Sequence, residues 1–199
     1  MNIFNSVSRH IDDETRFNFA NRLAVAMEPK ILDGDATDCS RLAWLLIACG
    51  KEDRAAEITD SGLRLDRNNE HCQNLNFRIW SPRFVSARKA NDLARLVEAV
   101  THLAQNPDFR FGEISEVANY FNLAGRETEV GSDLRQLLAR QLANAMASRI
   151  EEGNATDCSR LAWLFLQTGE QERASAVVEC GLKIDPNNEH CLKLKSRLN

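Results

Sequence analysis

The sequence predicts an all-α protein in which helix-turn-helix repeats stack as a short right-handed α-solenoid. Three observations lead to this prediction. The ten residues "ATDCSRLAWL" stand at 36–45 and again, unchanged, at 155–164. A shorter and weaker period of 33 residues recurs inside each copy, and periods of about 33 to 34 residues with helical patterning are typical of paired-helix arrays. The 199 residues include only 9 Gly and 4 Pro, so few positions break a helix.

The long repeat extends well beyond the identical block. Residues 35–78 align with 154–197 at a constant offset of 119 and without a gap. "NNEHC" closes both copies, and the offset also sets the preceding "NRLAVAMEPKI" against "RQLANAMASRI". The duplicated unit therefore includes the helix that precedes the identical block.

The short period appears when the copies are compared with themselves. "DCSRLAW" at 38–44 maps onto "HCQNLNF" at 71–77, which matches Cys to Cys and Trp44 to Phe77. A third instance, "VANYFNLAG" at 117–125, has apolar residues at the same spacing. Each repeat is therefore a pair of helices.

The elements follow in order along the chain. The expected helices span 13–31, 36–49, 52–65, 69–80, 86–105, 113–123, 132–151, 155–168, 171–183 and 188–197. The acidic run Asp12–Glu14 suits the start of the first helix, and Pro29 strains its end. Breaks are expected at Ser81–Pro82, at Asn106–Pro107 and between Gly125 and Ser132, where Ser132 can cap the next helix.

Two apolar stripes identify the buried faces of the middle helices. One stripe consists of Leu93, Val97, Val100 and Ala104, and the other of Leu138, Leu142, Ala145 and Met146. No segment with strand periodicity competes with them. We expect an N-terminal lobe at 1–80, a connecting helical segment at 81–112 and a C-terminal lobe at 113–199.

These repeats resemble the tetratricopeptide repeat (TPR) family over residues 36–80 and 113–197. The copy at 155–188 is similar to the family pattern at Leu161, Ala162, Phe165, Gly169, Ala174, Val178, Gly181 and Pro186. The copy at 36–69 keeps the same pattern except at Thr59 and Arg67, and Cys39 and Cys158 stand where the family favours Trp. The resemblance implies a non-enzymatic adaptor, scaffold or chaperone that binds a peptide, a helix or a partner subunit.

The resemblance also implies which residues line the concave binding surface. They are Thr37, Ser40, Trp44, Ile47 and Ala48 in the first copy, Phe77 by the short period, and Thr156, Ser159, Trp163, Leu166 and Gln167 in the last copy. The Lys and Asn residues with which the family clamps a peptide carboxylate are missing here. Two alternatives remain open: the tryptophans pack under this chain's own helices, or two copies of the protein cover each other's grooves.

The repeated Cys and His residues suggest a rival class, a thiol- or metal-dependent protein. Cys39, Cys72, Cys158 and Cys191 occupy one repeat position, and His71 and His190 precede two of them. However, the sequence has no CxxC pair, so the usual chelating spacing of zinc motifs is absent. We therefore interpret these cysteines as small packing residues and expect no cofactor, metal or catalytic residue.

The charge and the apolar content of the chain limit which classes of partner and which cellular compartment we expect. A net charge of -4 gives no general attraction to nucleic acid or to anionic membranes. The stretch "FRIWSPRFVSARK" at 77–89 combines basic and aromatic residues, which leaves a nucleic-acid-associated protein as a further alternative. No apolar run reaches the length of a membrane span or a signal peptide. We expect a cytoplasmic protein with free thiols.

Overall fold

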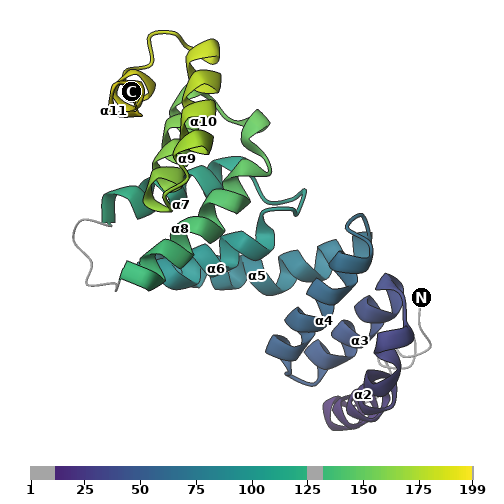
Figure 1. The fold of residues 1–199 in the computed structure, drawn as a ribbon. Coiled ribbons are helices and arrows are strands. Elements are labelled where there is room, and N and C mark those ends of the chain that lie inside the picture. The colour runs from purple at the N-terminus through teal and green to yellow at the C-terminus, as the bar shows by residue number, and fades with distance from the viewer. Residues whose placement is uncertain (1–11, 125–131, 199) are drawn as a thin grey trace. The chain divides into compact units, whose positions relative to one another are not determined.

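In a computed structural model, the described parts of the chain, residues 12–124 and 132–198, contain helices joined by turns and no strand (Figure 1). The elements are α2 (Asp13–Met27), η1 (Glu28–Asp33), α3 (Ala36–Ala48), α4 (Glu52–Leu65), α5 (Glu70–Ala90), α6 (Leu93–Leu103), α7 (Phe111–Ala124), α8 (Ser132–Ala147), η2 (Ile150–Glu152), α9 (Ala155–Gln167), α10 (Gln171–Ile184) and α11 (Glu189–Leu198). Here η marks a 3₁₀ helix. The all-α prediction is confirmed for these residues, and none of their helices combines the length and apolarity that crossing a membrane requires.

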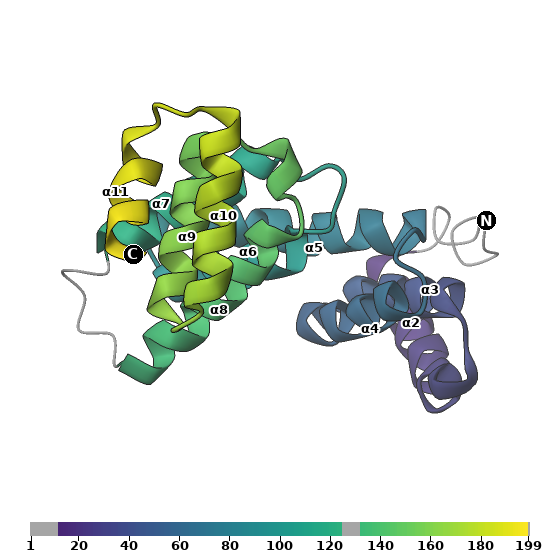
Figure 2. The ribbon, with the colours of Figure 1, turned by 45° about the horizontal axis from the view of Figure 1, so that its top comes forward.

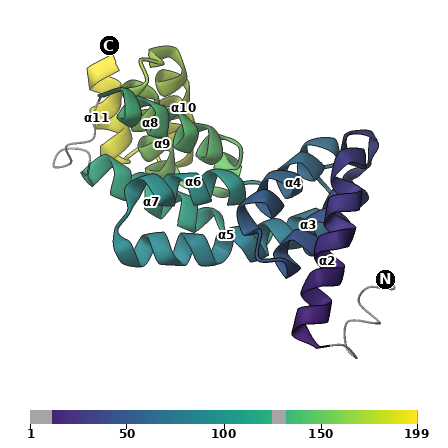
Figure 3. The same cartoon turned by 90° about the horizontal axis from the view of Figure 1, so that it is seen from below.

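The chain divides into two compact units, the first ending at Ile79 and the second beginning at Trp80. In the first unit, α3 packs against α4 and α2, and α2 lies beside α3 at the edge (Figure 3). In the second unit, α9 packs against α7, α8, α10 and α11, and α9 and α10 lie side by side (Figure 2). The expected connecting segment 81–112 lies wholly inside the second unit.

The two sequence copies begin and turn in the same way. Asp35 caps α3 by accepting the N–H of Asp38 at 2.8 Å, and Asn154 caps α9 through the equivalent N–H at 3.1 Å. Each first helix ends at a glycine with positive φ, 68° at Gly50 and 78° at Gly169, where a residue with a Cβ is strained. The offset of 119 therefore relates local structure as well as sequence.

A glycine in the second helix of each copy allows three helices to approach closely. A Cβ at Gly62 would lie 2.6 Å from Cys72 Sγ and 2.9 Å from Cys39 Cβ. At Gly181 the same atoms of Cys191 and Cys158 would lie at 2.7 Å and 2.9 Å. The small residues are therefore determinants of packing at both junctions.

The expected helix break at Ser81–Pro82 is wrong, because α5 continues through Pro82 to Ala90. The helix ends instead at Asn91, with φ 52°, where the N–H of Asp92 bonds the carbonyl of Ala87 at 3.0 Å. Proline costs a helix one hydrogen bond. Burial of one face of the second half of α5, which includes Trp80, Phe84 and Ala87, offsets that loss.

Two further helices are shorter than expected. The helix expected at 13–31 ends at Met27 and gives way to η1, which holds Pro29 in its first turn, a position that needs no N–H donor. The helix expected at 132–151 ends at Ala147, before Arg149 leaves the helical conformation at φ −138°. The break expected after Gly125 lies outside the described residues.

The two stripes are buried where α6 packs against α8. Val97, Val100, Leu142 and Met146 are completely or almost completely buried, and only Leu93 of the eight stripe residues is half-buried. The helical periodicity therefore identified the core of the second unit correctly.

Candidate interaction surface

An arginine lies over a tryptophan at equivalent places in the two copies. The guanidinium carbon of Arg78, on α5, lies 4.6 Å from the centre of the Trp44 ring on α3. In the second copy, that of Arg197, on α11, lies 4.8 Å from the centre of the Trp163 ring on α9. Trp44 corresponds to Trp163, and Arg78 to Arg197, at the offset of 119. The duplication therefore preserves a complete cation–π contact.

These two Trp–Arg pairs are accessible from outside the protein. Trp44 is 36% exposed and Trp163 is half-buried, so neither ring is enclosed in the core. Arg78 and Arg197 are exposed, and neither forms an ion pair with another described residue. At each place, a partly exposed indole ring therefore lies next to an exposed guanidinium.

The pattern of α3 explains why its tryptophan faces outward. Leu42, Leu45 and Leu46 are buried on the side where α3 meets its neighbours, and Trp44 follows Leu42 by about 200° around a helix of 3.6 residues per turn. The sequence comparison singled out the tryptophans but missed both arginines. The sequence did contain a signal for them, because Arg78 and Arg197 are related by the offset of 119.

Two of the expected surface residues are buried instead. Ser40 and Ser159 are 6% and 4% exposed, and each hydroxyl donates to the carbonyl three residues earlier, of Thr37 or Thr156, at 2.7 Å. Their polar groups are satisfied within their own helices. The two serines are therefore packing residues, which corrects their assignment to the binding surface.

Two of the remaining expected residues, Gln167 and Thr156, form hydrogen bonds with neighbouring helices. Gln167 donates from Nε2 to Asn122 Oδ1 at 2.9 Å and accepts from Arg135 Nε at 3.2 Å, which ties α9 to α7 and α8. Asn188 Nδ2 donates to the Thr156 hydroxyl at 3.3 Å. The other members, Thr37, Ile47, Phe77 and Leu166, are half-buried, and Ala48 is exposed.

Five of the six cysteines are buried, and Cys180 is exposed. Burial raises the pKa of the Cys72 thiol to about 12 and that of the Cys158 thiol to about 11. The thiols of Cys72 and Cys191 donate to the carbonyls of Ala36 and Ala155, both at 3.2 Å. Because the thiolate is the reactive and metal-binding form, these sites suit packing, as the sequence predicted.

No group of three or more His, Cys, Asp or Glu side chains within 12–124 and 132–198 is placed to hold a metal ion.

Within the basic and aromatic stretch at 77–89, the rings of Trp80 and Phe84 are buried in the second unit. Trp80 is 5% exposed and stacks on His102, with ring centres 3.8 Å apart and planes at 6°. Phe84 is also 5% exposed and meets Phe109 edge to face at 5.2 Å. Neither ring offers a free face on which a nucleic-acid base could stack.

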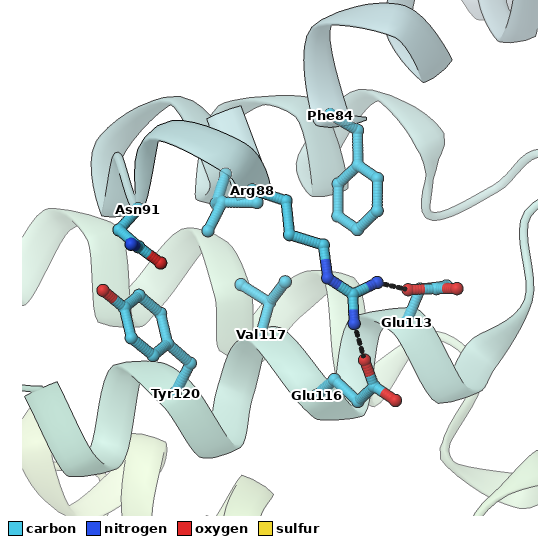
Figure 4. A pocket seen from close by; sticks show the side chains of 8 residues that line it. Phe84, Arg88, Asn91, Glu113, Glu116, Val117 and Tyr120 are labelled. Carbon is cyan, nitrogen blue, oxygen red and sulfur yellow. Dashed lines mark hydrogen bonds and ion pairs between the residues drawn. The ribbon is translucent and has the colours of Figure 1, made fainter. Parts of the chain in front are cut away.

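A small pocket of about 220 Å³ opens in the second unit, next to Phe84, Val117 and Tyr120 (Figure 4). Arg88 crosses it and donates to Glu113 at 2.8 Å and to Glu116 at 2.6 Å. The pocket is smaller than most small-molecule sites, which have about 300 to 1,000 Å³. Its guanidinium is already paired with two carboxylates, so the Trp–Arg pairs are the better candidate site.

Comparison of the sequence with models of known protein families finds no match, and a search among curated proteins finds no significant similarity.

Proposed function

We propose that the chain is a non-enzymatic protein-interaction module whose helix pairs form a TPR-like right-handed array. In this proposal, Trp44–Arg78 and Trp163–Arg197 are its two contact points for a partner protein. The observation that carries the proposal is the duplicated cation–π contact, in which each arginine is exposed and forms no ion pair within the described residues. Trp and Arg are also the residues most enriched among interface hot spots.

The chemistry of the pairs indicates what a partner presents to them. An indole offers a flat apolar surface, and a guanidinium offers parallel N–H donors that match a carboxylate. A peptide or helix with an acidic residue next to a large apolar one satisfies both groups.

The test uses Trp44→Ala and Trp163→Ala. Partner proteins are captured from native cell extract with the wild-type chain and identified by mass spectrometry. The dissociation constant of a purified partner is then measured for each variant. An interface anchor costs about 2 kcal/mol or more of binding, which is about 30-fold in the dissociation constant. Leu65→Ala is the matched control, because Leu65 is an exposed apolar residue, 62% accessible, on α4.

Thermal melting separates binding from packing. A buried tryptophan cut to alanine costs about 3 to 5 kcal/mol of stability, whereas these partly exposed rings should cost much less. Weaker binding with nearly unchanged melting supports the proposal. A large drop in melting temperature for both variants, or unchanged affinity for every partner, would contradict it.

A further inference from the structure

The small pocket of the second unit has an apolar part formed by three successive helices. Phe84 of α5, Leu96 of α6 and Val117 of α7 line it, and each is only 4 to 5% exposed. None of the residues that line the pocket lies in 35–78 or 154–197, the segments that the offset of 119 relates. The duplication therefore does not explain why these residues are present.

Two neutral polar side chains line the end of the pocket away from the ion pairs of Arg88 (Figure 4). They are the amide of Asn91 and the hydroxyl of Tyr120. Neither group forms a hydrogen bond with another residue in the ranges 12–124 and 132–198. An amide and a phenol hydroxyl can each donate and accept. This end of the pocket is therefore able to bind a group that does both.

Asn91 stands at a kind of position where the chain elsewhere has glycine. Its φ is 52°, and the other described residues with positive φ are Gly50 and Gly169. Asparagine is one of the few residues with a Cβ that adopt this conformation readily. A glycine between α5 and α6 would allow the same turn, but the pocket would then lack its amide.

The ionised side chains around the pocket neutralise one another. Arg88 donates to Glu113 at 2.8 Å and to Glu116 at 2.6 Å. Arg110 donates to the second carboxylate oxygen of Glu113 at 3.0 Å. Two guanidinium groups are thus paired with two carboxylates. A charged ligand would have to compete with these ion pairs, so the pocket favours an uncharged one.

The volume of the pocket limits the ligand to a single ring. A cavity of about 150 Å³ holds one benzene molecule, so the 220 Å³ present here leaves room for a ring and one small polar group. An aromatic ring suits the apolar part, because it can pack against Phe84 and Val117, and because arginine side chains such as Arg88 stack readily on aromatic rings. A primary carboxamide suits the polar end, since it both donates and accepts hydrogen bonds.

We infer that this pocket binds a small neutral molecule with one aromatic ring and a primary carboxamide. The ring lies between Phe84 and Val117, and the carboxamide bridges Asn91 and Tyr120. The inference is independent of the proposed partner binding, because it uses neither Trp–Arg pair.

Benzamide is the probe that tests the inference. Tyr120 is the only tyrosine of the chain, so protein labelled with fluorotyrosine gives one fluorine NMR signal, which comes from the pocket itself. We expect benzamide to shift this signal until it saturates, with a dissociation constant of about 1 mM. Acetophenone has the same shape but a methyl group in place of the amide nitrogen. It should bind about fivefold more weakly, because it cannot donate a hydrogen bond. Benzoate, which is charged, should also bind more weakly.

Two variants test the polar end on unlabelled protein, with affinity measured by saturation-transfer NMR of the ligand. Tyr120→Phe and Asn91→Gly each remove one hydrogen-bonding group, so each should weaken benzamide binding about fivefold. Glycine at position 91 tolerates the positive φ. Asn18→Ala is the control, because Asn18 is exposed on α2 and does not line the pocket; its affinity for benzamide should be that of the wild type.

Three results would overturn the inference. The first is a fluorine signal that benzamide leaves unshifted up to its solubility limit. The second is benzoate or acetophenone binding as tightly as benzamide, and the third is wild-type affinity for benzamide in both variants. Circular dichroism checks that each variant folds. Should Tyr120→Phe fail to fold, Asn91→Gly decides alone, because it leaves every buried side chain in place.

Discussion

Replacing Gly181 with alanine tests the close packing of the second copy most directly. Gly181 lies inside α10, where alanine is better than glycine by about 1 kcal/mol in helix propensity. On propensity alone, Gly181→Ala should stabilise the protein. The close packing around Gly181 predicts instead that Gly181→Ala destabilises the protein.

The magnitude follows from the two contacts of the added methyl group. It would lie 2.7 Å from Cys191 Sγ and 2.9 Å from Cys158 Cβ. The second atom is attached directly to the backbone, so no side-chain rotation relieves it and a helix must shift. Overpacking of this kind costs about 1 to 3 kcal/mol. After the gain in propensity of about 1 kcal/mol, we expect a net loss of about 0 to 2 kcal/mol, which lowers the melting temperature by up to roughly 8 °C.

Thermal and urea unfolding, followed by circular dichroism, measure this loss. Gly112→Ala is the control, because Gly112 lies in α7 and a Cβ there meets nothing within 4 Å; this variant should be unchanged or more stable. Adding Cys191→Ala to Gly181→Ala removes the nearer clash, so the double variant should be more stable than the sum of the single effects. A rise in melting temperature for Gly181→Ala alone would refute the reasoning.

Two further predictions concern the thiols and Arg149. Because burial raises the pKa of Cys72 from its ordinary value of 9.0 to about 12, its contribution to stability is intact below pH 9 and is lost as the pH rises from 9 to 12. Urea unfolding at pH 8 and pH 10 should show this loss in the wild type and a smaller one in Cys72→Ser. Arg149 donates to the carbonyl of Phe109 at 2.6 Å and pairs with Glu152 at 2.6 Å, so Arg149→Met should cost about 2 to 3 kcal/mol, against almost nothing for Arg95→Met at an exposed position. Equal stability of these two methionine variants would show that the Arg149 contacts contribute little.

The sequence was most informative where local rules and packing agree. The identical block predicted α3 and α9 to within one residue at either end, because a cap, a stripe and a turn glycine all mark the same helix. It failed at Pro82, where the local rule for proline was outweighed by burial of Trp80 and Phe84. That burial depends on tertiary contacts with His102 and Phe109, which no local pattern describes.

Only the tryptophans of the candidate site could be predicted from the sequence. Trp44 and Trp163 were visible as aromatic residues in a duplicated block, but each arginine lies on a different helix from its tryptophan. The spatial pairing becomes evident only from how the helices pack. Ser40 and Ser159 were misplaced for the same reason, because the resemblance gives a direction on an idealised helix and the actual neighbours decide which positions are covered.

The sharing of each Trp–Arg pair between two successive helix pairs has a consequence for how such a chain can evolve. The indole belongs to one repeat, and the guanidinium belongs to the first helix of the next. A single repeat moved into another protein would carry an indole without its cation. The smallest heritable unit of this surface is therefore one repeat plus the helix that follows it, and recombination at a repeat boundary would separate the pair.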